Sequence, residues 1–447
     1  MSFQTNPKLN RIGFDRYCDW MCDMNKFFRT FVHQFQSLDK PARLLLIAFF
    51  LDGLLFSGYS LFFNLYIIEA GYSRDFLGLI NAAPSLSALL LGVPMGMLSD
   101  RIGRKTSMLL GFSLANFAIL GMLISHSEPI MIGLAFLFGM VGQLYALSHA
   151  PFMMKVSNDA NRDILFSFSY AMFPLASTLG SFLAGYLPGI FRNSFHFNSS
   201  ATAYQGTLIF CVIASFLVLV PIAFIKEAKT THSSSEKQIE VKRTSVWKVL
   251  FRPLTIKLAL PNLVIGLGAA TLVPYFNVFF SERHKMTDSS LGILFSVGSL
   301  AIGIACILGP RIVGNLGGKI KTVVLGQLAS LGFLLLIGFS PWAWLAIIGY
   351  LARGALMNMV APLFDAYALE LTDEHEHGAV NSIRNLAWNV GWAIGPYISG
   401  LVQQRWGFAP LFINTAILYG AGVIMTWVFF RPKTVELKNI FLPNQGK

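Results

Sequence analysis

The sequence predicts an all-α membrane protein with twelve transmembrane helices, arranged as two pseudo-symmetric six-helix bundles. Hydrophobic residues make up 54% of the 447 residues and charged residues only 13%, whereas an average soluble domain carries about 25% charged residues. Apolar runs long enough to cross a bilayer recur along the chain. The pattern of the first half also returns in the second. This composition excludes an ordinary soluble enzyme and a disordered chain.

The apolar runs are expected to be helices, because lipid offers no hydrogen-bond partner to a backbone amide. A β-barrel is excluded, since its strands would alternate apolar and polar residues. The twelve runs cover residues 43–69, 76–98, 106–125, 129–154, 164–190, 202–225, 256–281, 289–310, 322–339, 342–369, 378–402 and 409–430.

One polar segment breaks the hydropathy between the sixth and seventh runs. It combines many Lys and Arg residues with a Ser/Thr-rich stretch, which is typical of a linker. We therefore predict an N-terminal arm at 1–42, a first bundle at 43–225, a cytoplasmic linker at 226–255, a second bundle at 256–430 and a cytoplasmic tail at 431–447.

Positive charge orients the bundle. With the N-terminus inside, 27 of the 34 Lys and Arg residues lie in inner segments, 5 in outer loops and 2 within spans. This asymmetry predicts that both termini are cytoplasmic, and it explains the net charge of +12 without nucleic acid. In the arm, aromatic and Met side chains recur every three or four residues from Phe14 to Phe35. They predict an amphipathic helix on the lipid surface or, alternatively, one packed on the bundle.

The two bundles share a repeat. A shift of about 214 residues places Gly103-Arg104-Lys105 on Gly317-Gly318-Lys319, and a shift of about 215 places Gly180 and Gly185 on Gly395 and Gly400. An offset that survives over so long a stretch predicts two parallel bundles around a central path.

A charged loop joins the second and third runs, and residues 92–105 read GVPMGMLSDRIGRK. Gly96 lets neighbouring helices approach closely. Asp100 lies where it can cap a helix or accept from an arginine. The basic side chains of Arg101, Arg104 and Lys105 are suited to the inner membrane side.

The spacing G-x3-G-x3-D-R-x-G-R-K resembles the loop signature of the major facilitator superfamily. The resemblance covers the whole chain, although the second copy at 309–319 lacks the acidic residue. It implies the major facilitator fold and secondary transport by alternating access. It further implies that Asp100 latches the two halves, with Arg101 and Arg104 as supports. The implied gating loop consists of Gly92, Gly96, Asp100, Arg101, Gly103, Arg104 and Lys105.

Two titratable residues within spans are candidates for proton coupling. Asp52 lies about nine residues into the first span, and a charge at this depth is costly enough that it should face the bundle interior. It is either a proton or cation site or a structural carboxylate. His149 in the fourth span titrates near physiological pH and suits a proton relay; the alternative is a structural hydrogen-bonding residue.

Two arginines within spans are candidates for substrate binding, because arginine keeps its charge in proteins. Arg353 lies near mid-depth in the tenth span, and Arg384 lies in the inner third of the eleventh. Both suit a carboxylate or phosphate of a substrate. The alternative is an internal ion pair with Asp365 or Asp52, except that Asp365 lies too far along the same helix to reach Arg353. Arg384 is equally a candidate gate or topology residue.

Further polar and aromatic residues are expected along the path. Asn385 and Asn389, one turn apart, share a face of the eleventh span. Together with Arg353 and Arg384, the predicted substrate path comprises Asn385, Asn389, Asn64, Gln143 and Trp388. The aromatic residues are equally suited to helix packing.

The sequence favours a proton-coupled transporter of a small anionic or amphipathic solute. The alternatives are a broad-specificity drug/proton antiporter and a membrane receptor or enzyme on the same fold. No nucleotide-binding loop or metal motif is present, and the four cysteines are too scattered for a disulfide framework. We therefore predict no enzyme activity, cofactor or metal. The expected partners are a small-molecule substrate, protons and membrane lipids. The protein is expected to be a monomer in a bacterial inner membrane.

Overall fold

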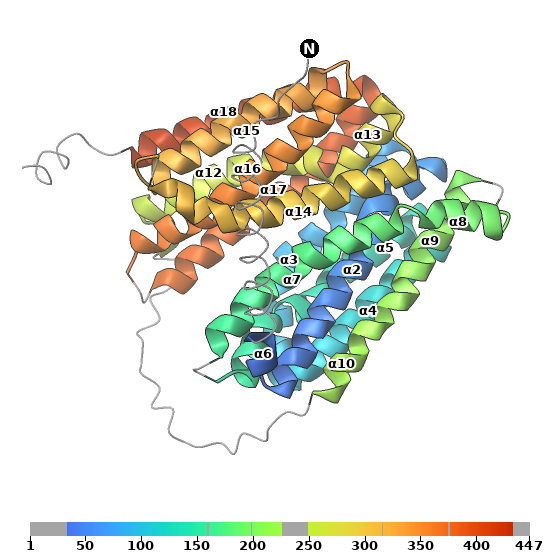
Figure 1. Cartoon of the computed structure of the whole chain (residues 1–447), viewed down its shortest axis with the longest axis horizontal. Coiled ribbons are helices and arrows are strands. Elements are labelled where there is room, and N and C mark those ends of the chain that lie inside the picture. Colours follow the sequence, from blue (N-terminus) through green and yellow to red (C-terminus); the bar gives the residue numbers. More distant parts are fainter. Residues whose placement is uncertain are drawn as a thin grey trace, which may run out of the picture.

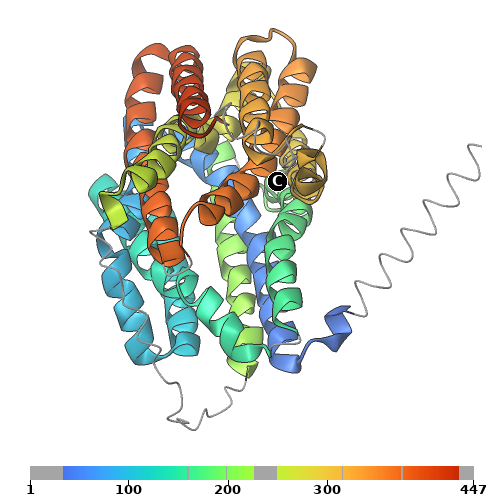
Figure 2. The same cartoon turned by 90° about the vertical axis from the view of Figure 1, so that its left-hand side faces the viewer.

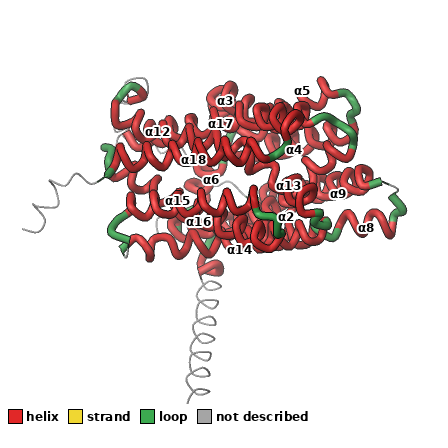
Figure 3. Tube along the Cα trace, turned by 90° about the horizontal axis from the view of Figure 1, so that it is seen from above, coloured by secondary structure: helices red, strands yellow, loops and turns green. Residues whose placement is uncertain are grey.

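The computed structural model describes residues 34–158, 161–197, 199–225, 249–314, 316–373 and 376–431. The predicted amphipathic helix of the arm falls almost wholly outside these residues, as do most of the linker and nearly all of the tail. The described part of the chain is helical throughout and contains no strand (Figure 3). This confirms the all-α prediction.

Each apolar run of the sequence corresponds to a long helix or to a rod of short helices joined end to end. The first half comprises α2 (Lys40–Glu69), α3 (Arg74–Ile102), α4 (Arg104–Ile124), α5 (Glu128–Ala146) with α6 (His149–Val156), α7 (Arg162–Ala184) with α8 (Leu187–Ser194), and α9 (Ser200–Ser215) with η1 (Phe216–Val218) and α10 (Leu219–Phe224). The second half comprises α12 (Pro253–Leu272) with η2 (Val273–Tyr275) and α13 (Phe276–His284), α14 (Asp288–Val313), α15 (Lys319–Phe339), α16 (Ala343–Glu370), α17 (His377–Trp406) and α18 (Ala409–Phe430).

Eleven helices of the described residues are long and apolar enough to cross a membrane. The predicted eleventh span, α17, is a helix of 30 residues but is not among them. It carries Arg384 and the asparagines Asn381, Asn385 and Asn389, which lower its hydropathy. The helix is present, and its membrane crossing stays a prediction.

The two halves begin corresponding helices with the same local devices. Ser73 before α3 and Thr287 before α14 each accept a hydrogen bond from a backbone amide of the first turn. Gly103 before α4 and Gly318 before α15 have φ angles of +90° and +113°, which glycine adopts readily. The internal repeat therefore includes the residues that cap these helices.

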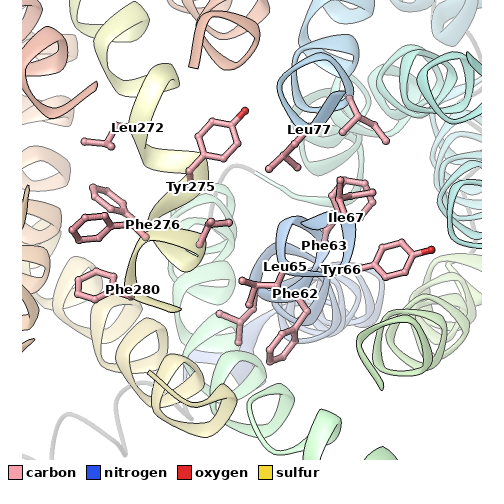
Figure 4. Packing of buried hydrophobic residues seen from close by; sticks show 14 of the residues in the cluster. Phe62, Phe63, Leu65, Tyr66, Ile67, Leu77, Leu272, Tyr275, Phe276 and Phe280 are labelled. Atoms are coloured by element: carbon pink, nitrogen blue, oxygen red, sulfur yellow. The ribbon is translucent and has the colours of Figure 1, made fainter. Parts of the chain in front are cut away.

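The buried clusters show how the halves meet. Figures 1 and 2 show the blue-to-green helices of the first half beside the yellow-to-red helices of the second. One cluster contains residues of both halves, and Figure 4 shows Phe62, Phe63 and Leu77 together with Leu272, Tyr275 and Phe276. A second cluster lies within residues 38–225 and a third within residues 249–430. The halves thus share a core at one end and have separate cores at the other.

We call the shared end, where α2 ends and α3 begins, the outer end, after the orientation that the charges predict. At this end Gly78 of α3 packs on Gly400 of α17, and Gly185, the residue after α7, packs on Gly292 of α14. A Cβ at Gly400 would lie 2.3 Å from the carbonyl oxygen of Arg74. These glycines therefore allow the two halves to approach backbone to backbone.

We predict opposite effects for two glycine-to-alanine changes. Gly400→Ala should lower the melting temperature, because overpacking costs roughly 1–3 kcal/mol. Gly332→Ala in α15 is the matched control, since nothing lies within 4 Å of its Cβ position. It should stabilise the helix by roughly 0.5–1 kcal/mol. Thermal unfolding of the purified protein measures both, and equal shifts for the two variants would contradict the packing described.

Candidate functional site

A cavity of about 460 Å³ lies between the two halves, within the usual size range of ligand sites. Its walls come from α2, α3 and α5 of the first half and from η2, α13, α14, α16 and α17 of the second. The aromatic wall residues are Phe56, Tyr59, Phe63, Phe138, Phe276, Phe295, Tyr350 and Trp392. The polar ones are Ser60, Asn64, Asn81, Ser85, Asn277, Arg353 and Asn358.

Arg353 carries the positive charge of this central cavity. Its side chain is buried, with 7% exposure, and Nη2 donates to the hydroxyl oxygen of Tyr419 at 2.6 Å. The guanidinium also lies 5.4 Å from the ring centre of Phe276 and 5.6 Å from that of Tyr419, positions suited to cation–π attraction. Among the described residues no carboxylate forms an ion pair with it. The arginine that sequence reasoning placed on the path therefore lines the cavity without an acidic partner.

Two asparagines in the cavity wall tie the halves together. The Nδ2 of Asn64 donates to the carbonyl oxygen of Pro274 at 2.6 Å, and that of Asn277 donates to the carbonyl oxygen of Leu61 at 2.7 Å. Asn81 donates in turn to Oδ1 of Asn64 at 3.0 Å. Asn64, predicted on the path, thus lies in the wall, but its amide is committed to a contact between the halves.

A smaller pocket of about 240 Å³ opens within the first half. It is lined by Asp52 and Tyr145, and it shares Phe56, Tyr59 and Phe138 with the central cavity. We call it the side pocket. Because the two spaces have walls in common, the half-buried carboxyl of Asp52 lies next to the central cavity.

Tyr145, in the wall of the side pocket, contacts both residues predicted for proton coupling, although His149 itself does not line the pocket. The hydroxyl of Tyr145 donates to Oδ2 of Asp52 at 3.2 Å. The ring of Tyr145 lies edge-on to His149, with ring centres 4.2 Å apart. Nε2 of His149 is buried and has no hydrogen-bond partner among the described residues. Asp52, Tyr145 and His149 therefore form one cluster. Sequence reasoning did not assign the middle member, Tyr145, to the site.

Other predicted path residues lie away from both spaces. Gln143 is half-buried on α5 and lines neither of them. Trp388 packs against Gly266, where a Cβ would lie 3.1 Å from its ring. Asn385 and Asn389 are exposed, on the same helix face as the cavity residue Trp392. These asparagines therefore face the side of α17 on which the cavity lies, but they are not part of its wall.

Arg384 is held in a structural ion pair. Its side chain is 2% exposed, and Nη2 donates to Oδ1 of Asp365 at 2.6 Å. The guanidinium lies 5.0 Å from the ring centre of Phe364. Arg384 lines neither the central cavity nor the side pocket. This geometry matches the internal ion pair that the sequence left open as the alternative to substrate binding.

A sequence model of the Major Facilitator Superfamily matches residues 45–351 and 263–444. The chain belongs to this superfamily. It is 24% identical over 400 residues to the multidrug resistance protein MdtG of Dickeya zeae, covering 86% of this chain and 93% of that protein. It is 19% identical over 366 residues to the quinolone resistance protein NorA of Staphylococcus aureus, covering 81% and 89%. The match confirms the resemblance seen in the loop and points to a transporter rather than an enzyme.

Solved structures show the same fold. The bacterial homologue of the human lysosomal transporter Spinster aligns with a TM-score of 0.71 at 11% identity, covering 87% of this chain and 95% of that one. The nucleoside transporter NupG aligns with a TM-score of 0.68 at 11% identity, covering 88% and 100%. At such low identity these likenesses confirm the fold alone.

The superfamily loop is folded onto the first half of the transporter. Asp100 forms an ion pair with Arg104 one turn along the chain, and Nη1 of Arg104 donates to Oγ of Ser99 at 3.0 Å. Arg101 is exposed. Asp100 thus accepts from an arginine, as expected. In this structure the pair lies within one half, in keeping with the separated inner ends.

Within the part of the chain that the structure describes, the contacts of Lys105 and Gly96 also lie in the first half. Nζ of Lys105 donates to the carbonyl oxygens of Ala223 and Ile225 at 2.7 Å, at the end of α10, where helix carbonyls lack partners. Gly92 has open space around its Cβ position, and Gly96 meets only Leu147 at 3.5 Å. The close approach that Gly96 permits is therefore not used in this state.

We predict that replacing Asp365 and replacing Arg384 lower the stability of the protein by different amounts. Asp365→Asn should destabilise the superfamily fold by about 1–3 kcal/mol, because it leaves a buried guanidinium without its counter-charge. Arg384→Met should cost less, since Asp365 is 61% exposed and stays hydrated. Thermal unfolding measures stability, and solute uptake into proteoliposomes measures function. A folded Arg384→Met variant that binds no solute would instead place Arg384 in the substrate site.

Proposed function

We propose that this chain is a proton-coupled secondary transporter of small amphipathic organic solutes that carry an acidic group. The observation that carries the proposal is Arg353, a permanent cation in an aromatic cavity without a carboxylate partner among the described residues. A carboxylate or phosphate of the solute would supply the counter-charge. The aromatic walls would bury its apolar part.

The way the halves are joined supports alternating access as the mechanism of this transporter. They share a core and two glycine contacts at the outer end, and they have separate cores at the inner end. Rocking of the halves about the central cavity would expose it to each side in turn. The excess of Lys and Arg in the inner segments supports an orientation in which the inner end faces the cytoplasm.

The side pocket supports Asp52 as the coupling residue. Its only hydrogen bond within the described residues comes from the neutral hydroxyl of Tyr145, so no positive charge holds it ionised. A proton on Asp52 would remove the cost of burying a charge. His149, whose ring packs edge-on against Tyr145, would pass protons to Asp52.

Asp52→Asn should reduce proton-driven accumulation of solute in proteoliposomes by about tenfold or more. Solute exchange at equal pH on both sides of the membrane should continue. The asparagine mimics a permanently protonated carboxyl, so the transporter can still reorient but gains nothing from the gradient. Asp373→Asn makes the same chemical change at an exposed loop residue and should leave accumulation unchanged. Normal gradient-driven accumulation by Asp52→Asn would remove it from the mechanism.

Arg353→Ala should eliminate thermal stabilisation of the purified protein by acidic aromatic compounds. A ligand at a hundred times its dissociation constant stabilises by about 2.7 kcal/mol, which is well within the resolution of such a measurement. The control is Arg405→Gln, which removes an exposed arginine at the end of α17. Stabilisation by acidic compounds that survives Arg353→Ala would show that this arginine is structural.

The second candidate function is broad-specificity efflux of apolar or cationic compounds by proton exchange. It is favoured by the names of the relatives, a multidrug resistance protein and a quinolone resistance protein, and by the apolar lining of the side pocket around Asp52. The same panel distinguishes the two. Stabilisation by lipophilic cations, lost in Asp52→Asn and kept in Arg353→Ala, would support efflux.

A further inference from the structure

Two charged clamps join the halves at the outer end, one beside each glycine contact. The first is built on Arg74 of the first half. Its Nη2 lies 2.5 Å from Oε1 of Glu282, its Nη1 donates to Gln403 at 3.1 Å, and its backbone amide donates to Gln404 at 3.0 Å. All three partners belong to the second half.

The second clamp is built on Asp288 of the second half. It forms an ion pair with Arg192 of α8 and accepts a hydrogen bond from the hydroxyl of Tyr204 of α9 at 2.7 Å. Both partners belong to the first half, and the side chain of Asp288 is 13% exposed. The two clamps therefore run in opposite directions across the boundary.

The clamps occupy corresponding positions of the repeat. Arg74 is the first residue of α3 and Asp288 the first residue of α14, and the two are about 214 residues apart. One turn further along, Gly78 and Gly292 are the glycines that pack against the opposite half. The geometry of the position is repeated, whereas the sign of its charge is reversed.

We propose that Arg74 and Asp288 are reciprocal gating residues, whose clamps together hold the outer end closed. The proposal rests on the alternating access proposed above. If the halves rock as rigid bodies, the two boundaries α3–α17 and α7–α14 open in one movement. Breaking either clamp then shifts the same equilibrium between a closed and an open outer end. A change at one boundary therefore alters the opening of the other.

The experiment breaks the clamp at one boundary and reads the opening at the other. The reporter is Ser181→Cys, a residue on α7 with 5% exposure whose backbone lies beside Gly292. It is placed in a background with the four native cysteines replaced by alanine. The measurement is its alkylation rate by a water-soluble maleimide in the purified full-length protein.

Glu282→Gln, which weakens the clamp of Arg74, should speed alkylation at Ser181→Cys by about tenfold, the loss expected for one charged hydrogen-bonded pair. The charge-swapped pair Arg74→Glu with Glu282→Arg should return the rate toward that of the parent. Glu370→Gln is the control, since it breaks an ion pair with Lys319 that lies within the second half.

An alkylation rate unchanged by Glu282→Gln, or raised no more than by Glu370→Gln, would overturn the proposal. If Glu282→Gln does not fold, Arg74→Gln, which removes the same ion pair from the first half, makes the same test with the same reporter. The measurement needs neither solute nor proton gradient. Faster alkylation without any transport would therefore support the clamps while refuting the proposed function, and transport with unchanged alkylation would do the reverse.

Discussion

The close approach of backbones at Gly78–Gly400 and Gly185–Gly292 is the contact on which the rest of the structure depends. Lipid is as apolar as a leucine side chain, so helices in a membrane gain little from burying apolar surface against each other, and small residues that permit tight packing decide where they associate. Because both contacts lie at one end, the halves share a core there and separate toward the other. The central cavity lies between the halves, and Asn64 and Asn277 tie them across its wall.

The charged residues within the helices fall into two kinds. They differ in which groups offset the free-energy cost of removing a charge from water. A charge away from water is expensive unless it is paired. Arg384 is paired with Asp365, and it lines neither cavity. Among the residues that the structure describes, Arg353 contacts only ring faces and a tyrosine hydroxyl, and Asp52 accepts from only one tyrosine hydroxyl. The two charges whose cost is incompletely met are those that line cavities. This arrangement is expected if the acidic group of a solute pairs with Arg353 and a proton neutralises Asp52 during the transport cycle.

Much of the fold was predictable from sequence, because apolar runs, the loop signature and the repeat are local or periodic signals. The site was predictable only in part. Asp52, His149 and Arg353 stand out, since charges and histidines are rare in spans. Tyr145 does not, because aromatic residues make up 14% of the chain and its role depends on the tertiary arrangement that lets its hydroxyl reach Asp52 of α2. The sequence likewise could not decide whether Arg384 meets a solute or Asp365, because that choice depends on how α16 and α17 pack.

Comparison of the two halves distinguishes positions that shape the fold from positions that line the cavities. Where the halves correspond, a shift of about 215 residues relates Gly103 to Gly318 and Gly185 to Gly400, and these positions shape helix ends and contacts. The same shift relates Arg353 to Phe138. Arg353 and Phe138 both line the central cavity, so one geometric position supplies a cation from one half and a ring from the other. Duplication of the bundle thus provides the frame. Divergence at its cavity-lining positions then distinguishes the halves, because the first contributes a half-buried acid and the second a fixed positive charge.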